Sequence, residues 1–158
     1  MGYTQAPPLT SEETESLLRE AKIARFCSFN EDRTIHATPV WFKYENGQIV
    51  VVTPATSRKA RNVKRNRNVT VLVDVETWPQ RGVIVYGEAD LEYSTSYEEH
   101  MSATVLVCEK YMPRDKAESW CKDLFKISRP WAKIIIKLKR VVSFDYAKDV
   151  TFGAVVKG

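Results

Sequence analysis

Short apolar runs joined by tight turns limit the folds that are open to this chain. The turn Glu45-Asn46-Gly47 is typical of a β-hairpin, because Asn and Gly tolerate the positive φ angles that tight turns require. Strands joined by hairpins pair antiparallel, whereas a doubly wound α/β fold needs a crossover helix between successive strands. We therefore expect a mainly β protein, a six-stranded antiparallel split β-barrel with inserted helices. The expected strands cover residues 23–29, 35–44, 49–53, 69–75, 83–93 and 132–144.

The remaining segments are expected to form helices and two terminal segments. Thr10 and Glu13 have the spacing of a capping box, which favours a helix over residues 11–21. Ser57 is placed to cap a helix over residues 58–66, and residues 97–127 predict two helices that separate near Met112-Pro113. A chain of 158 residues is of single-domain length, so we expect one domain. Its ends would be a loose N-terminal arm over residues 1–9 and a tail over residues 147–158.

The composition is that of a globular protein, with 44% apolar and 28% charged residues. The cysteines fit neither a disulfide framework nor a CxxC motif, and His36 and His100 give no zinc-ligand spacing. The sequence has no secretory signal pattern and no apolar window of the roughly 18 residues that span a membrane. We expect a cytoplasmic protein with no metal site and no membrane partner.

Positive charge is concentrated at the start of one expected helix. Six basic residues and no acidic residue lie between Arg58 and Arg67, and this run exceeds the net charge of +4. Such a run is as readily a solvated helix face. Its position directly after a strand that ends at Val52-Thr53 favours a phosphate site instead, because a helix N-terminus offers unpaired N–H groups and a partial positive charge. Ser57, Arg58 and Lys59 would form it, helped by the Thr53 hydroxyl.

Pro39 interrupts an expected strand. Proline cannot donate a ladder hydrogen bond, so it belongs at an edge, at a bulge, or where the backbone faces something other than a strand.

In order along the chain, the segments Val50–Thr53, Pro54–Thr56, Ser57–Asn62 and Asn68–Val71 resemble the core of the pyridoxamine 5′-phosphate oxidase-like, FMN-binding split barrels. The resemblance runs from about residue 23 to residue 93, and the last apolar strand is compatible with the closing strand of that family.

This resemblance implies a homodimer with FMN at the subunit interface. The strand before the Gly-containing turn would lay its backbone along the isoalloxazine edge, and the next strand would end beside the ribityl phosphate. The cofactor-binding residues that it implies are Ala37, Thr38, Pro39, Val40 and Trp41 for the ring, and Val52, Thr53, Ser57, Arg58 and Lys59 for the phosphate end.

The chain departs from the family pattern at two places. Gly82 stands where the oxidase has a Gln near the flavin, so that side-chain contact is missing. Arg81 either reaches the cofactor instead or is an exposed loop arginine. The C-terminal residues 146–158 lack the Trp- and Arg-rich pattern with which the oxidase recognises its substrate, so we do not expect pyridoxamine phosphate to be the substrate.

The resemblance therefore leads to an FMN-dependent oxidoreductase acting on an unidentified small molecule, with no catalytic residue assigned. Within the family, the 8-hydroxy deazaflavin coenzyme is an alternative cofactor, and a non-enzymatic protein that binds flavin, deazaflavin or haem is an alternative function. A nucleic-acid-binding module is less favoured, because no aromatic residue lies between Arg58 and Arg67.

Overall fold

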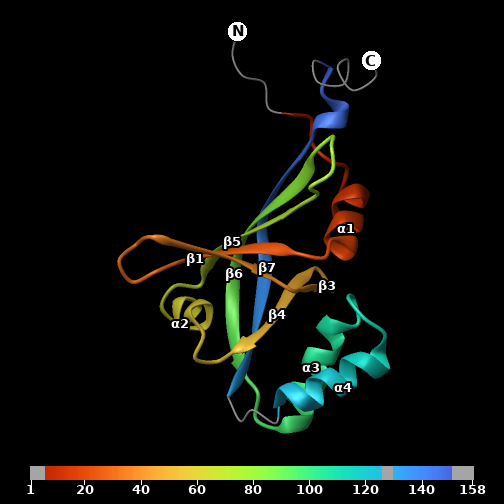
Figure 1. The fold of residues 1–158 in the computed structure, drawn as a ribbon. Coiled ribbons are helices and arrows are strands. Elements are labelled where there is room, and N and C mark those ends of the chain that lie inside the picture. Colours follow the sequence, from red (N-terminus) through yellow and green to blue (C-terminus); the bar gives the residue numbers. More distant parts are fainter. Residues whose placement is uncertain (1–5, 126–129, 151–158) are drawn as a thin grey trace.

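The computed structural model describes residues 6–125 and 130–150 (Figure 1). The helices are α1 (Ser11–Glu20), α2 (Arg58–Arg65), α3 (Tyr97–Cys108) and α4 (Arg114–Phe125), with a short 3-10 helix η1 (Tyr146–Lys148). The strands are β1 (Ala24–Phe29), β2 (Ile35–Val40), β3 (Lys43–Glu45), β4 (Gln48–Pro54), β5 (Asn68–Asp74), β6 (Arg81–Tyr93) and β7 (Trp131–Asp145).

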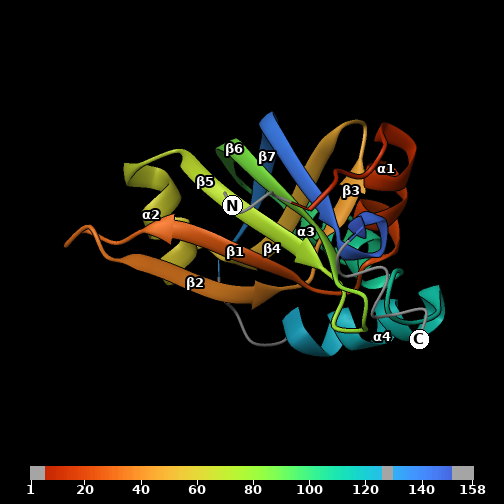
Figure 2. The same cartoon turned by 90° about the horizontal axis from the view of Figure 1, so that it is seen from above.

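The strands of the described residues form one antiparallel sheet in the order β2-β1-β5-β6-β7-β4-β3. The expectation of a mainly β, antiparallel split barrel is confirmed. The order places β2 and β3 at opposite edges, although only Trp41 and Phe42 separate them in the sequence. A flat sheet of this width would put its edges about 29 Å apart, whereas Val40 and Lys43 can be at most about 11 Å apart. The sheet must therefore curl until its edges approach, which leaves a split between β2 and the β3–β4 edge (Figure 2).

Residues 35–44 were expected to form one strand, but they form two, β2 and β3. The sheet therefore has seven strands, and the expected number of six was wrong. Phe42 is fully buried in the barrel core, and its backbone N–H donates to the Tyr111 hydroxyl at 3.0 Å. The burial of this side chain turns the backbone out of β2 and into β3. Pro39 lies in β2 at the sheet edge, one of the places expected for it.

Inward-facing side chains of the strands fill the barrel, and they are mainly valine and isoleucine. Helices close its two ends, with Leu17 and Leu18 of α1 at one end and Val63 of α2 at the other. Figures 1 and 2 place α1 and α2 on opposite sides of the sheet. The capping box at the start of α1 is confirmed, because Glu13 N–H donates to Thr10 Oγ1 at 3.2 Å and Thr10 N–H donates to Glu13 Oε2 at 2.7 Å.

β6 and β7 are the longest strands and carry a bulge between Tyr86 and Gly87. A Cβ atom at Gly87 would lie 2.5 Å from Ile136 Cγ2, which explains the glycine.

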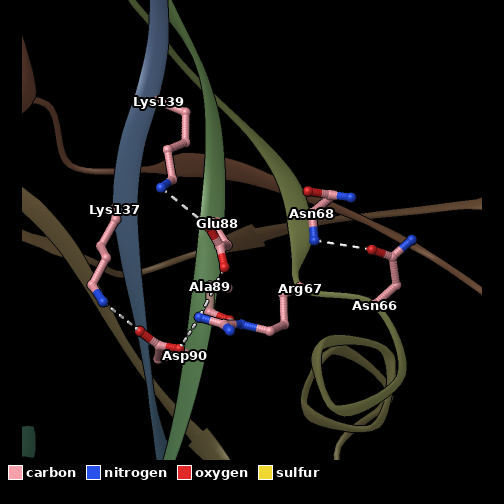
Figure 3. A network of polar contacts seen from close by, with 8 residues as sticks. All are labelled: Asn66, Arg67, Asn68, Glu88, Ala89, Asp90, Lys137 and Lys139. Atoms are coloured by element: carbon pink, nitrogen blue, oxygen red, sulfur yellow. Dashed lines mark hydrogen bonds and ion pairs between the residues drawn. The ribbon is translucent and has the colours of Figure 1, made fainter.

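Ion pairs on the outer face of these strands attach the chain after α2 to the sheet (Figure 3). Arg67 contacts both Glu88 and Asp90, Lys137 contacts Asp90 at 3.0 Å, and Lys139 contacts Glu88 at 3.1 Å. The pKa of Glu88 is lowered mainly by its hydrogen bond with Lys139, and the pKa of Asp90 mainly by its hydrogen bond with Lys137.

The two helices expected over residues 97–127 are present as α3 and α4, separated near Met112-Pro113 and packed on each other through Val105, Cys108, Ala117 and Cys121. Residues 126 and 127 lie outside the described residues, as do parts of the expected arm and tail. Residues 6–9 of the arm lie against β7, where Leu9 N–H donates to Ser143 Oγ at 3.0 Å. Within the described residues, no helix is long and apolar enough to cross a membrane.

A buried amide attaches α2 to β1. Asn62 is 1% exposed, and its Nδ2 donates to Ser28 Oγ at 3.0 Å and to Asn30 Oδ1 at 3.1 Å. Its Oδ1 accepts from Arg65 at 2.7 Å. The basic helix is therefore held by a polar anchor as well as by Val63.

We predict that Asn62→Ala lowers the free energy of unfolding by about 1–3 kcal/mol, because it leaves the buried Ser28 hydroxyl without its partner. Chemical denaturation would measure the loss. Lys64→Ala, an exposed change on the same helix, should stay within about 0.5 kcal/mol of the wild type. Equal stabilities of the two variants would show that the anchor contributes nothing.

Candidate functional site

Two of the segments singled out in the sequence border the split. β2 pairs only with β1 among the described strands, which leaves one edge of residues 37–40 unpaired. β4 pairs with β3 only over residues 48–50, so residues 51–54 have β7 on one side and the split on the other. The backbone of both segments thus has one side without a strand partner in the described chain, and α3 packs against β4.

The start of α2 adjoins the end of β4. Ser57 is the N-cap, with its hydroxyl accepting from Ala60 N–H at 3.2 Å and its own N–H donating to Pro54 O at 2.9 Å. The Thr53 hydroxyl donates to Ser57 Oγ at 3.0 Å, and Lys59 Nζ donates to Thr53 Oγ1 at 3.4 Å. The structure therefore brings Thr53, Ser57 and Lys59 into one contact group.

The cations at the start of α2 form no close ion pair among the described residues, although the Arg58 charge lowers the pKa of Asp32 in the β1–β2 turn. Arg65 pairs with Glu31 and Arg67 pairs with Glu88, whereas Arg58, Lys59 and Arg61 have no carboxylate partner within residues 6–125 and 130–150. Lys59 is half-buried, and burial lowers its pKa, which means that its cation lacks compensation. An anion bound here would supply it.

The charges of these cations also act on a residue of β2. The pKa of His36, at the start of β2, is lowered first by burial and then by the charges of Arg58 and Lys59. The start of α2 lies beside the β1–β2 turn, where Arg58 and Asp32 line one cleft.

Arg58 and Lys59 diverge from the helix start. Arg58 lines a cleft of about 620 Å³ between α2 and the β1–β2 turn, where Glu31 and Asp32 also lie. Lys59 turns the other way, toward Thr53. The two side chains can hold an anion from two sides only if it sits over the helix start, where the N–H groups point.

Trp41 is stacked on Tyr111, which the sequence did not suggest. The two rings are 4.2 Å apart with an interplanar angle of 13°, and Trp120 lies 5.9 Å from Trp41. One face of the Trp41 ring is thus covered by the α3–α4 connection, although the residue is still 37% exposed. No local pattern could reveal this stack, because it joins residues far apart in the sequence.

Lys110, beside that stack, is a second residue that sequence reasoning missed. Its Nζ lies 3.7 Å from the centroid of the Phe42 ring and donates to Leu18 O at 3.3 Å. Burial, and secondarily the charge of Lys22, lowers the pKa of Lys110 to about 8.

Arg81 and Gly82 lie away from the candidate residues at the phosphate end. Gly82 pairs with Phe144 and Thr53 pairs with Ala132 on the same strand β7. The twelve intervening steps correspond to roughly 40 Å of extended strand. The ring end is nearer: Gly82 pairs with Asp74, and Leu72 and Pro39 both pair with Arg25, so about three strand spacings, roughly 14 Å, separate Gly82 from the end of β2. A Cβ at Gly82 would lie 2.6 Å from Phe144 Cζ, so the missing Gln has a local cause.

Within the described residues, no group of three or more His, Cys, Asp or Glu side chains is placed to hold a metal ion.

We predict that the free energy of unfolding rises between about pH 8 and pH 10.5 through Lys110. Its folded pKa of about 8 lies below the ordinary 10.5, so in this window the unfolded chain binds more protons than the folded one. Denaturation curves across the window would show a smaller rise for Lys110→Met, while the exposed change Lys116→Met keeps the wild-type slope. A slope unaffected by Lys110→Met would contradict the burial of this cation.

Comparisons with known proteins agree with this architecture. The family model described as pyridoxamine 5′-phosphate oxidase matches residues 10–126. No curated protein sequence matches the chain significantly.

Three solved structures are similar. A conserved hypothetical protein of Mycobacterium tuberculosis has a TM-score of 0.75 at 22% identity, covering 92% of each chain. A FAD-binding protein of Mesorhizobium loti has a TM-score of 0.60 at 16% identity, covering 87% of this chain and 93% of the other. An F420 reductase has a TM-score of 0.62 at 19% identity, covering 84% and 98%. At these identities the likenesses show the fold alone.

Proposed function

The chain belongs to the pyridoxamine 5′-phosphate oxidase-like family, and from this premise we propose that it binds the FMN group of a flavin and acts as a flavin-dependent oxidoreductase on a small molecule. The observation that carries the proposal is the uncompensated cation of Lys59 beside the Thr53 and Ser57 hydroxyls, at a helix start that opens on the split. This donor set suits a phosphate, which needs several donors and positive charge.

The phosphate would be held by the N–H groups at the start of α2, by the Lys59 ammonium and by the Arg58 guanidinium. The exposed backbone of Ala37–Val40 would orient the ring along the split, with Val52 beside the ribityl chain. Trp41, stacked on Tyr111, would limit the access of water to that end.

The bound flavin would supply hydride or electron transfer, and the protein would bind, orient and shield it. No side chain of the chain needs to act as an acid or a base in this scheme.

Pyridoxamine phosphate is not the substrate that we propose. Gly82 offers no amide where the oxidase has its Gln, and the space beside it is taken by Phe144. An 8-hydroxy deazaflavin is the alternative cofactor. The likeness to an F420 reductase favours testing it, although the phosphate donor set suits either ligand.

A homodimer would complete the site. Arg81 and Gly82 lie roughly 40 Å along β7 from the phosphate residues, so a contact of theirs with the phosphate end would require a second chain. The outer face of the sheet offers a surface for it: Phe29 is 44% exposed, Ile35 67% and Tyr86 37%, around a groove of about 440 Å³. Exposed apolar side chains gathered in this way are typical of an interface.

The cofactor proposal is tested by titrating the purified protein with FMN and with riboflavin, following flavin absorbance and fluorescence quenching. We expect the wild type to prefer FMN, because riboflavin lacks the phosphate. Arg58→Ala/Lys59→Ala should weaken FMN binding about a hundredfold, the effect of losing about 3 kcal/mol of charge-assisted hydrogen bonds.

Riboflavin affinity should be unchanged in that double variant. The exposed pair Lys64→Ala/Lys122→Ala removes the same charge elsewhere and should bind FMN as the wild type does. Failure of the wild type to bind FMN overturns the proposal, and binding of the 8-hydroxy deazaflavin in its place selects the alternative cofactor.

The dimer proposal is tested by sedimentation velocity. Ile35→Glu places a charge in the apolar groove and should shift the protein from dimer to monomer. Val150→Glu changes an exposed apolar residue outside this groove and should leave the dimer intact. A wild-type protein that sediments as a monomer at all accessible concentrations would exclude the shared site.

A further inference from the structure

His36 is a titratable residue of β2 that the phosphate site does not yet include. The register of β1 and β2 sets it directly opposite Ser28. Opposed residues of an antiparallel pair project from the same face of the sheet. Ser28 is 3% exposed and belongs to the inward-facing side chains of β1, so the imidazole of His36 also lies on the inner face of the sheet.

The start of α2 is within electrostatic range of this imidazole. Asn62 Nδ2 donates to Ser28 Oγ at 3.0 Å, which holds α2 against β1 (Figure 2). Arg58 is one helical turn before Asn62 and lies on the same face of the helix. Burial lowers the pKa of His36 first, and the charges of Arg58 and Lys59 lower it further. The imidazole thus lies where the charges of both cations act.

The helix start is approached from both borders of the split. On the β4 border, Lys59 Nζ donates to Thr53 Oγ1 at 3.4 Å, beside the N-cap Ser57. On the β2 border, His36 lies next to the β1 residue that Asn62 holds. An anion over the N–H groups of α2 would therefore have hydroxyls and an ammonium on one side and an imidazole on the other.

The surroundings of His36 keep it neutral unless an anion is present. β1 contributes the neutral Ser28, and no carboxylate pairs with His36 in the described part of the chain. The charged residues of the neighbouring elements, the start of α2 and the β1–β2 turn, are Arg58, Lys59, Glu31, Asp32 and Arg33. Glu31 pairs with Arg65 at 3.5 Å, and Asp32 accepts from Thr34 N–H at 3.0 Å. A phosphate beside the imidazole would reverse the balance and favour its protonated form.

We propose that His36 is a further phosphate-binding residue, which takes up a proton when an anion binds at the start of α2 and then donates a hydrogen bond to that anion. The inference rests on the proposed function, because it needs the flavin phosphate at this place. The proton comes from the solvent, and no covalent bond of the ligand changes. Because the bound form holds the extra proton, the affinity for FMN rises as the pH falls through the histidine range.

The experiment measures the affinities of FMN and riboflavin by fluorescence quenching at about pH 6 and about pH 8, on either side of the ordinary histidine pKa. His36→Gln keeps a polar side chain that cannot become a cation, and His36→Lys carries a cation at both pH values. Riboflavin, which lacks the phosphate, is the control ligand. Thermal melting followed by circular dichroism checks that each variant is folded.

We expect the wild type to bind FMN about tenfold more tightly than His36→Gln at the lower pH, as one charge-assisted hydrogen bond can provide. At the higher pH the two should bind FMN equally. His36→Lys should bind FMN more tightly than His36→Gln at both pH values. The riboflavin affinity should be the same in all three proteins.

An NMR titration of the imidazole signals needs no substitution at the site. The chain has two histidines, and His100, which packs on Phe125 and Trp131, serves as the internal reference. We expect FMN to raise the pKa of His36 and to leave that of His100 unchanged.

A pKa of His36 that stays the same when FMN binds overturns the inference and leaves the proposed function standing. The same conclusion follows if the FMN affinities of the wild type and His36→Gln change equally with pH. A wild type that binds FMN at neither pH overturns the proposed function itself.

Discussion

The fold depends on a two-residue connection between opposite edges of one sheet. Trp41 and Phe42 join β2 to β3, which stand at the two ends of the strand order, so the sheet has to curl until these edges almost meet. Burial of Phe42 and the hydrogen bond from its N–H to Tyr111 hold the connection in place. The split with its open backbone is a result of this connection, because a longer link would allow a flatter sheet.

The basic run after β4 separates into two parts once the chain is folded. Its second part is structural: Arg65 and Arg67 pair with Glu31, Glu88 and Asp90. Its first part, Arg58 to Arg61, has no such partners in the described chain. The same helix therefore attaches to the barrel at one end and carries cations without close carboxylate partners at the other.

Local patterns predicted what depends on near neighbours. The capping box at Thr10, the N-cap at Ser57 and the hairpin at Gly47 each involve residues within four positions, and the structure confirms all three. The break between β2 and β3 escaped prediction because it depends on the burial of Phe42 and on its hydrogen bond to Tyr111, which exist only in the folded chain. The packing of His100 on Phe125 and Trp131 escaped for the same reason, since it joins residues of α3, α4 and β7. The contacts among Thr53, Ser57 and Lys59 could be expected, because strand, turn and helix start follow each other directly in the sequence.

The Gly87 bulge also bears on how the two longest strands find each other. Residues 94–130 separate β6 from β7, so no tight turn aligns them, and a shift by two residues would keep every side chain on its proper face. The contact between Gly87 and Ile136 tolerates no Cβ, and such a shift would bring Val85 or Ala89 there instead. The close contact at this glycine is therefore compatible with only one alignment of β6 and β7. It disfavours mispaired strands while the barrel folds.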